Sequence, residues 1–214
     1  MQKNTILFDF DFTLADSSQG IFKCINYALN KLGLAEKDYS TIKYTIGHSL
    51  PETYRILTKR NSGKEENEFV KHFVKKADEI MNLNTRVYPE VFELMPIIKE
   101  KGYKTGIIST KYRYRIQGIL ERDDLNDYFD IIVGGEDVSK HKPDPEGLLQ
   151  AIKNLGVRKE QILYVGDSLV DLTAAKDADI EFVAVVTGTV TKESFEKEGC
   201  NHIISNLNSL VNFI

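Results

Sequence analysis

The strongest constraint on the fold is a series of short apolar runs that alternate with helical patterns over the second half of the chain. Strands of this length, alternating with helices, indicate a parallel sheet that is covered by helices on both faces. The sequence therefore predicts an α/β fold with a doubly wound, Rossmann-like parallel sheet. The expected strands lie at 5–8, 104–108, 131–133, 162–165 and 182–186, with a weaker one at 203–204.

The stretch between the first expected strand and the others has helical periodicity only. Ile21, Ile25 and Leu29 recur at spacings of four residues, and Ser62 and Glu65 have the spacing of a capping box before a further periodic segment. No convincing strand interrupts this block. We therefore expect a core formed by residues 1–15 and 86–214, with a small all-helical cap domain, residues 16–85, inserted after the first strand.

Composition excludes several classes of protein. The 28 Lys and Arg residues against 32 Asp and Glu residues give a formal net charge of −4, which argues against a general nucleic-acid binder. No apolar run approaches the ~20 residues of a membrane span, and the run at 5–8 is too short for a signal-peptide core. Cys24 and Cys200 show no metal or redox spacing. We expect a cytoplasmic monomer or weak homodimer without nucleic-acid or membrane partners.

The first expected strand ends at two acidic residues, Asp9 and Asp11, followed by Thr13. Residues at i and i+2 of an extended segment point the same way, so both carboxylates leave the strand together. Ligands of open α/β sheets bind beyond the carboxyl ends of the strands, and Mg²⁺ commonly takes one or two carboxylates together with substrate phosphate. A metal-neutralised aspartate is also a competent nucleophile. A solvated acidic loop would give the same pattern.

Two further segments carry groups suited to a phosphoryl group. Ser109 and Thr110 follow the strand 104–108, where hydroxyl and backbone donors can hold phosphoryl oxygens. Lys142 lies in a turn whose neighbouring prolines, Pro143 and Pro145, restrict the backbone and fix the reach of its ammonium group. Taken alone, each segment is equally typical of an ordinary turn. We expect His141, next to Lys142, to be exposed on the surface.

A second pair of acids follows the strand 162–165. A glycine turn leads to Asp167, expected at or near a helix cap, and Asp171 lies one helical turn further on the same face. An ordinary helix start explains this pair equally well. The four segments together, however, supply a nucleophile, metal ligands, a positive clamp and oxygen donors, which are the parts that in-line phosphoryl transfer requires.

The order and spacing of these motifs resemble the haloacid dehalogenase-like superfamily, and within it the phosphoglycolate phosphatase-like branch. The first motif corresponds to residues 9–13, the second to Ser109, the third to Lys142 and the fourth to residues 166–171. The likeness extends over essentially the whole chain. It implies a phosphatase that acts on a small phosphorylated metabolite, with Mg²⁺ as cofactor and a phospho-aspartate intermediate.

The resemblance also implies roles for individual residues. Asp9 would attack phosphorus, and Asp11 would protonate the leaving oxygen and then activate water. Mg²⁺ would be ligated by the carboxylates of Asp9 and Asp167 and by the main-chain carbonyl of Asp11. Asp171 would support the metal's water shell or Lys142. Ser109 and Lys142 would hold the phosphoryl group. The expected substrate contacts are Thr13, Gly47, His48 and Thr110.

Three positions depart from the family pattern. Phe12 stands where a glycine is common, Thr110 where asparagine is frequent, and Asp179 where glycine is usual. We expect Phe12 to reshape the turn over the site. Asp179 tolerates a left-handed backbone moderately well. None of the three departures removes a catalytic group.

Several alternatives remain open at this point. A sugar-phosphate mutase of the β-phosphoglucomutase type, or a pyrophosphatase, would use the same scaffold. A phospho-accepting receiver or a silent binding module is the non-enzymatic alternative. A receiver is usually a single domain of about 120 residues without such an insertion, and a silent relative would be expected to have lost Asp9, Asp11 or Lys142.

Overall fold

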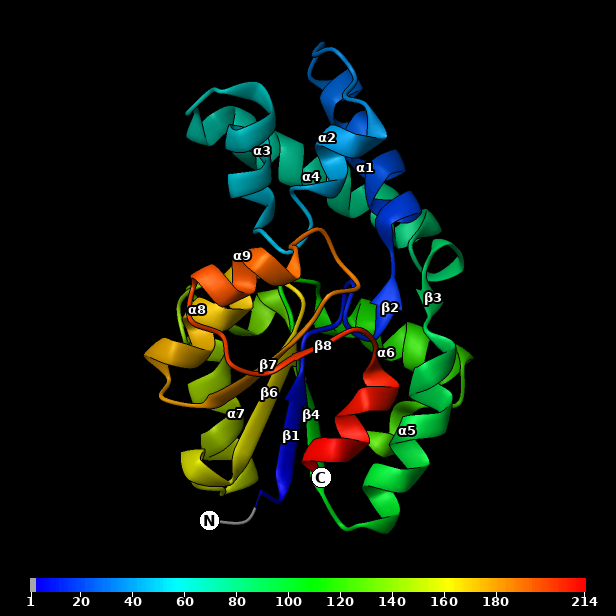
Figure 1. The fold of residues 1–214 in the computed structure, drawn as a ribbon. Helices are drawn as coiled ribbons and strands as arrows, with labels where there is room; N and C mark the ends of the chain where they lie inside the picture. The colour runs from blue at the N-terminus through cyan, green and yellow to red at the C-terminus, as the bar shows by residue number, and fades with distance from the viewer. Residues whose placement is uncertain (1–2) are drawn as a thin grey trace.

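The computed structural model describes residues 3–214 (Figure 1). Its main feature is a six-stranded parallel sheet with the strand order β5-β4-β1-β6-β7-β8, in which β1 lies between β4 and β6. The predicted doubly wound α/β fold is confirmed. The strands of this sheet are β1 (Thr5–Phe8), β4 (Lys104–Ile108), β5 (Ile131–Val133), β6 (Ile162–Gly166), β7 (Glu181–Val185) and β8 (Ile203–Ile204).

Alternation along the strands divides the core between the two faces of the sheet. Ile6 and Phe8 of β1 pack into one hydrophobic cluster, whereas Leu7 packs into the other. All three side chains are fully buried. Apolar residues on both faces explain why the strands are continuous apolar runs in the sequence.

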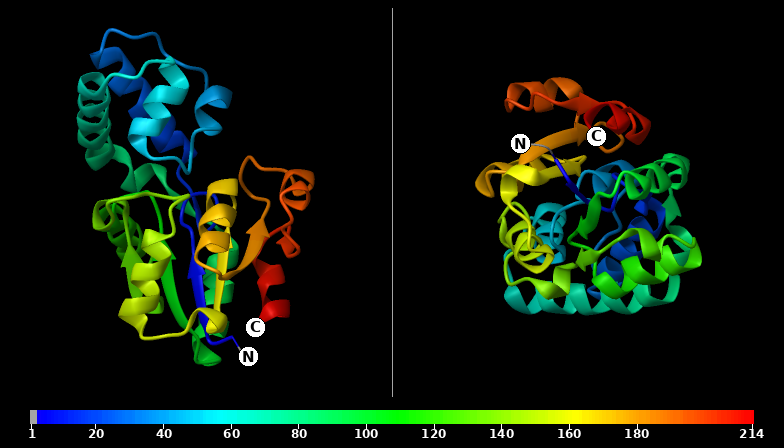
Figure 2. Two further views of the ribbon diagram at one scale, coloured as in Figure 1. Left: turned by 90° about the vertical axis from the view of Figure 1, so that its left-hand side faces the viewer. Right: turned by 90° about the horizontal axis from the view of Figure 1, so that it is seen from below.

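Helices cover both faces of the sheet (Figure 2). One cluster is completed by α5 (Pro89–Glu100), α6 (Arg113–Arg122) and a C-terminal 3-10 helix (Leu207–Phe213). The other is completed by α7 (Glu146–Leu155), α8 (Leu169–Asp177) and α9 (Lys192–Lys197). None of the described helices is both long enough and apolar enough to cross a bilayer.

The segment after β1 forms four helices that stand above the carboxyl edge of the sheet (Figure 1). These helices, called the helical insert below, have a hydrophobic cluster of their own that includes Cys24, Ile25, Tyr54 and Phe69. The Ser62 side chain accepts a hydrogen bond from the Glu65 amide, as the capping-box spacing predicts. The helices are α1 (Ser18–Lys31), α2 (Tyr39–Lys43), α3 (Leu50–Thr58) and α4 (Gly63–Ile80).

The two connections between the insert and the sheet form a small antiparallel ribbon that the sequence analysis missed. Its strands are β2 (Ala15–Asp16) and β3 (Arg86–Val87). The expectation of an entirely helical block from residue 16 is therefore wrong at Asp16. Strands of two residues are too short to show an alternating pattern, so the sequence gives no signal for them.

Side-chain contacts from different elements join the insert to the core. The buried Arg115 of α6 pairs with Asp78 of α4, with its Nη2 2.6 Å and its Nε 2.9 Å from Asp78 Oδ1. The Thr110 hydroxyl donates to the Gly47 carbonyl oxygen at 3.4 Å. Lys43 places its ammonium 5.2 Å from the centre of the Phe12 ring. The insert is thus held against the strand ends where the sequence motifs converge.

Candidate active site

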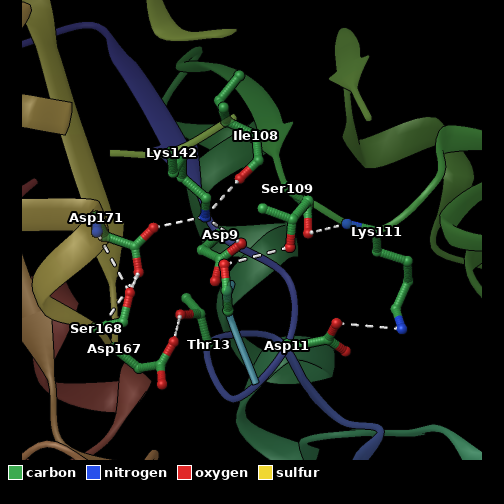
Figure 3. A network of polar contacts seen from close by, with 12 residues as sticks. Asp9, Asp11, Thr13, Ile108, Ser109, Lys111, Lys142, Asp167, Ser168 and Asp171 are labelled. Carbon is green, nitrogen blue, oxygen red and sulfur yellow. Dashed lines mark hydrogen bonds and ion pairs between the residues drawn. The ribbon is translucent and has the colours of Figure 1, made fainter. Parts of the chain in front are cut away.

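The four sequence motifs meet at the carboxyl edge of the sheet (Figure 3). Asp9 and Asp11 follow the central strand β1, and Ser109 follows β4. Asp167 follows β6, and Lys142 reaches the group from the loop before α7. Because β4 and β6 flank β1 in a parallel register, residues more than a hundred positions apart lie together.

Lys142 occupies the centre of the charged cluster. Its Nζ lies 2.7 Å from Asp9 Oδ1 and 2.6 Å from Asp171 Oδ1, and it also donates to the Ile108 carbonyl oxygen at 3.3 Å. Burial alone would lower the pKa of Lys142, but the Asp171 and Asp9 carboxylates outweigh burial and raise the pKa above its usual range. The ammonium therefore stays charged, and a buried positive charge adjoins the carboxylate of Asp9.

Asp171 is held rigidly by neutral donors as well as by Lys142. Its carboxylate accepts hydrogen bonds from the Tyr164 hydroxyl at 2.7 Å and from the amide and hydroxyl of Ser168, the amide at 3.1 Å. Ser168, rather than Asp167, is the N-cap of α8, and together with Asp171 it forms a capping box. Asp167 directly precedes this cap, as the expectation of a position at or near it allows, and lies outside the helix.

Glycine makes the close approach at β6 possible. A Cβ atom at Gly166 would lie 2.7 Å from the Cβ and Cγ atoms of Asp171, closer than real Cβ contacts allow. Gly188, in the segment after β7, similarly borders Asp167, because a Cβ there would lie 2.0 Å from Asp167 Oδ2. The sequence analysis did not identify Gly188 as part of the site.

Three buried carboxylates fit a divalent cation. Asp9, Asp167 and Asp171 each offer an oxygen within 4.8 Å of the others. Burial raises the pKa of Asp9 to about 7 and raises that of Asp167 well above its usual range, and the neighbouring carboxylates add to both effects. Crowded buried carboxylates of this kind are stabilised either by protonation or by a bound cation. Hard oxygen donors suit Mg²⁺. Asp9 and Asp167 therefore fit the predicted metal, whereas Asp171 is already held by Lys142, Tyr164 and Ser168.

We expect the metal-free protein to become less stable as the pH rises. The folded protein holds a proton on Asp9 up to a pH of about 7, whereas an unfolded chain releases it near the ordinary value of 3.8. Stability linked to this proton is therefore present below about pH 4 and is lost as the pH rises towards 7. Thermal unfolding in a chelator should give a lower midpoint at pH 8 than at pH 5.

The control for this prediction is Asp9→Asn, which removes the titrating group and should reduce the difference between the two midpoints. Saturating Mg²⁺ should also reduce it, because a bound cation stabilises the ionised carboxylates. If the midpoint of the metal-free wild type does not change between the two pH values, as is expected of Asp9→Asn, the assignment of the proton to Asp9 is contradicted.

Asp11 has an ion-pair partner that the sequence analysis did not identify. Lys111 Nζ lies 3.1 Å from Asp11 Oδ2, and both side chains are almost fully buried. The other oxygen, Oδ1, is buried without a hydrogen-bond partner among the described residues. The Ser109 hydroxyl accepts a hydrogen bond from the Lys111 amide at 3.2 Å, which connects the two motifs. Lys111 directly follows Ser109 and Thr110, so its position next to the second motif was visible in the sequence.

A cavity of about 220 Å³ lies between the insert and the core. Three of the expected substrate contacts line it, namely Gly47, His48 and Thr110, and Asp11 connects it to the charged cluster. Thr13 is not among its lining residues. The Thr13 side chain is fully buried, and its hydroxyl donates to Asp167 Oδ1 at 3.4 Å, so it contacts a carboxylate of the acidic cluster instead.

The expectation that His141 is exposed is wrong. Its side chain is half-buried and lines the cavity, and its Nδ1 has no hydrogen-bond partner among the described residues. Burial lowers the pKa of His141. Tyr112 and Arg115 of the core also line this cavity and were not expected there. Their positions depend on how the insert packs on α6, which no local pattern indicates.

In the turn after β1, Phe12 takes a left-handed backbone, the conformation that a glycine adopts most easily. Phe12 adopts a left-handed φ of 61°, and its amide donates to the Ala15 carbonyl oxygen at 2.7 Å. The Thr187 hydroxyl donates to the Phe12 carbonyl oxygen. Asp179 likewise takes a left-handed φ of 55°, as the sequence analysis allows. The Phe12 ring lies in this turn with its centre 5.2 Å from Lys43 Nζ.

Comparisons with known proteins agree with this geometry. The model of the family described as haloacid dehalogenase-like hydrolase matches residues 6–185. A phosphoglycolate phosphatase of Aquifex aeolicus is 33% identical over 88% of this chain and 87% of its own. The pyrophosphatase PpaX of Bacillus cereus is 31% identical over 86% of this chain and 84% of its own.

One solved structure is similar in both fold and sequence. It is the crystal structure of a “Putative haloacid dehalogenase-like hydrolase” from Bacteroides fragilis, with a TM-score of 0.95 and 43% identity. The match covers 98% of this chain and all of that chain. A likeness of this extent includes the helical insert as well as the sheet.

Proposed function

Because the chain belongs to the haloacid dehalogenase-like hydrolase family, we propose that it is a Mg²⁺-dependent phosphatase that hydrolyses a small phosphomonoester through a phospho-aspartate on Asp9. The observation that carries this proposal is the position of Asp9. It is a buried carboxylate at the end of the central strand, paired at 2.7 Å with the ammonium of Lys142. The names of the Aquifex and Bacillus relatives support phosphate chemistry.

In the first step, a carboxylate oxygen of Asp9 bonds to phosphorus and the bond from phosphorus to the leaving oxygen breaks. Asp11 gives its proton to that oxygen. Its Oδ1, which has no partner among the described residues, is the atom suited to this transfer. Lys142 and Ser109 hold the phosphoryl oxygens and stabilise the negative charge in the transition state.

In the second step, Asp11 takes a proton from water and the resulting hydroxide bonds to phosphorus. The bond between phosphorus and Asp9 breaks, which releases inorganic phosphate and restores the carboxylate. Lys111, 3.1 Å from Asp11 Oδ2, orients Asp11 for both proton transfers. Proton transfer by a positioned group of this kind typically contributes a factor of about 10²–10⁴ to the rate.

Asp9, Asp167 and the main-chain carbonyl of Asp11 would hold Mg²⁺. When bound, the ion neutralises the crowded carboxylates and polarises a phosphoryl oxygen. Asp171 has its hydrogen-bonding capacity occupied by Lys142, Tyr164 and Ser168, so we assign it to holding Lys142 rather than to the metal. The helical insert acts as a cap that excludes water from the cavity.

A pyrophosphatase is the second candidate, because a relative with that name covers most of the chain. The two candidates share the nucleophile, the acid and the metal site and differ only in the leaving group. A sugar-phosphate mutase would use the same first step but return the phosphoryl group to a sugar. Incubation with a hexose phosphate and a bisphosphate separates mutase from phosphatase, since only the mutase gives an isomerised sugar.

The test of the proposal is phosphate release from phosphomonoesters and from inorganic pyrophosphate. We expect release with Mg²⁺, loss in a chelator, and poor replacement by Ca²⁺. Mg²⁺ holds near-octahedral ligands at about 2.0–2.1 Å, whereas the larger Ca²⁺ takes more ligands and would draw the attacking oxygen of Asp9 into coordination. Full activity in a chelator would contradict the metal dependence, and absence of release from every phosphate compound would contradict the proposed function.

A further inference from the structure

The cavity between the insert and the core has an apolar side. This side, called the apolar wall below, belongs to the insert. Ile25, Phe73 and Met81 are at most 5% exposed, and the half-buried Val70 lies on the same face of α4 as Phe73. The apolar wall consists of Ile21, Ile25, Val70, Phe73 and Met81.

The charged groups of the core side already have partners. Lys111 Nζ pairs with Asp11 Oδ2 at 3.1 Å. Arg115 Nη2 pairs with Asp78 Oδ1 at 2.6 Å and donates to the Val74 carbonyl oxygen at 3.2 Å. Both side chains are at most 8% exposed. Arg115 therefore has a counter-charge of its own, and Lys111 is held in its contact with Asp11, so neither side chain is free to turn towards a second anionic group.

Two histidines, His48 and His141, also line the cavity. His48 Nδ1 lies 3.2 Å from a carboxylate oxygen of Glu52. Burial lowers the pKa of His141, so its imidazole is neutral near pH 7. Among the described lining residues, Lys111, Arg115, His48 and His141 are the only ones that can carry positive charge. Of these, Lys111, Arg115 and His48 each lie against a carboxylate oxygen of another residue.

From this lining we infer that the preferred substrate, within the proposed phosphatase function, is a phosphomonoester whose leaving alcohol has an apolar body. A carboxylate or second phosphate in this cavity would lose its hydration without meeting a cation that is free of other contacts. A hydrocarbon group would instead remove the apolar wall from water. The cavity is about seven times the ~30 Å³ that a water molecule takes in the liquid, so there is room for a ring.

The first test compares kcat/KM for three alkyl phosphates with Mg²⁺: ethyl phosphate, 2-phenylethyl phosphate and phosphoglycolate. All three are phosphates of aliphatic alcohols, so the comparison reports mainly on the body of the leaving group. We expect 2-phenylethyl phosphate to exceed the other two by at least about tenfold, since even one methylene in an apolar pocket is typically worth that factor. Phosphoglycolate as the best substrate, or equal values for ethyl and 2-phenylethyl phosphate, would overturn the inference.

The second test adds a positive charge to the apolar wall with Val70→Lys. Val70 is half-buried in a long helix, where lysine is well tolerated. The ratio of kcat/KM for 2-phenylethyl phosphate to that for phosphoglycolate should fall at least about tenfold. The matched control is Val211→Lys, at a 41% exposed position of the C-terminal 3-10 helix, which should leave the ratio unchanged. An unchanged ratio in folded Val70→Lys protein would overturn the inference.

Binding separates failure of this inference from failure of the proposed function. Calorimetric titration of Asp9→Asn protein with the same three esters and Mg²⁺ should give at least about tenfold tighter binding of 2-phenylethyl phosphate. If the wild type hydrolyses none of the esters, the proposed function fails, while the order of affinities still decides the inference. If hydrolysis is efficient but phosphoglycolate binds most tightly, only the inference fails.

Discussion

Replacing Asp9 with asparagine should abolish phosphate release while leaving the fold intact. The change removes the attacking charge but nearly preserves volume, and losing the covalent nucleophile costs about 10⁶ in kcat in a well-studied hydrolase. Lys142 keeps Asp171 as a partner at 2.6 Å, so its ammonium remains paired. Initial rates of phosphate release, measured with Mg²⁺ and saturating substrate, give the loss directly.

A matched control for Asp9→Asn is the same substitution at an exposed acid far from the site. Asp179 is exposed and follows α8, and its left-handed φ of 55° suits asparagine equally well. Asp179→Asn should therefore retain activity close to that of the wild type. Substantial phosphate release by pure Asp9→Asn protein would exclude Asp9 as the nucleophile.

Replacing Lys142 with methionine should affect both activity and stability. The buried carboxylates of Asp9 and Asp171 would lose the cation that lies 2.7 and 2.6 Å from them. Removing one partner of a buried ion pair typically costs about 3–5 kcal/mol of folding free energy. Loss of one charge-stabilising group at a phosphoryl oxygen should reduce kcat by about 10²–10³. Denaturant unfolding in a chelator measures the first effect, and phosphate release with Mg²⁺ measures the second.

The neighbouring Lys140 provides the control for this substitution. Its side chain is 72% exposed and lies 3.6 Å from Asp144, so Lys140→Met should change neither quantity appreciably. The destabilisation of Lys142→Met should also be smaller at pH 5 than at pH 8, because burial raises the pKa of Asp9 to about 7 and protonation of Asp9 relieves the missing charge. Equal effects of the two lysine substitutions would show that Lys142 is not the central cation.

The sheet and the charged cluster at its edge could be predicted from the sequence because both depend on local patterns. The main strands of the sheet appear in the sequence as short apolar runs. The acidic residues from Asp9, the hydroxyl of Ser109 and the glycine turn at Gly166 lie at the ends of such runs. In a parallel sheet all of these ends lie at one edge, so placing the strands places the site. Lys142 was found because the prolines beside it mark a constrained turn.

The remaining parts of the site depend on packing between distant segments. Arg115 meets Asp78, and Lys142 meets the Tyr164 hydroxyl, across separations that no sequence spacing reveals. The half-buried position of His141 likewise follows from the loop folding back towards the cavity. The apolar wall shares its residues with the amphipathic face of the insert helices, which reads as ordinary core in a sequence. The apolar wall could therefore be identified only from the structure.

The most direct test of the central claim is to trap the phosphoryl group on Asp9. Asp11→Asn protein lacks the base of the second step. A brief pulse of p-nitrophenyl phosphate with Mg²⁺ supplies a leaving group that needs little protonation, so the first step can proceed. After an acid quench, intact-protein mass spectrometry should detect one added phosphoryl group, and peptide mapping should locate it on Asp9. The double variant with Asp9→Asn should stay unmodified. Phosphate release by Asp11→Asn without any adduct at any pulse time, or an adduct on another residue, would contradict catalysis through a phospho-aspartate at Asp9.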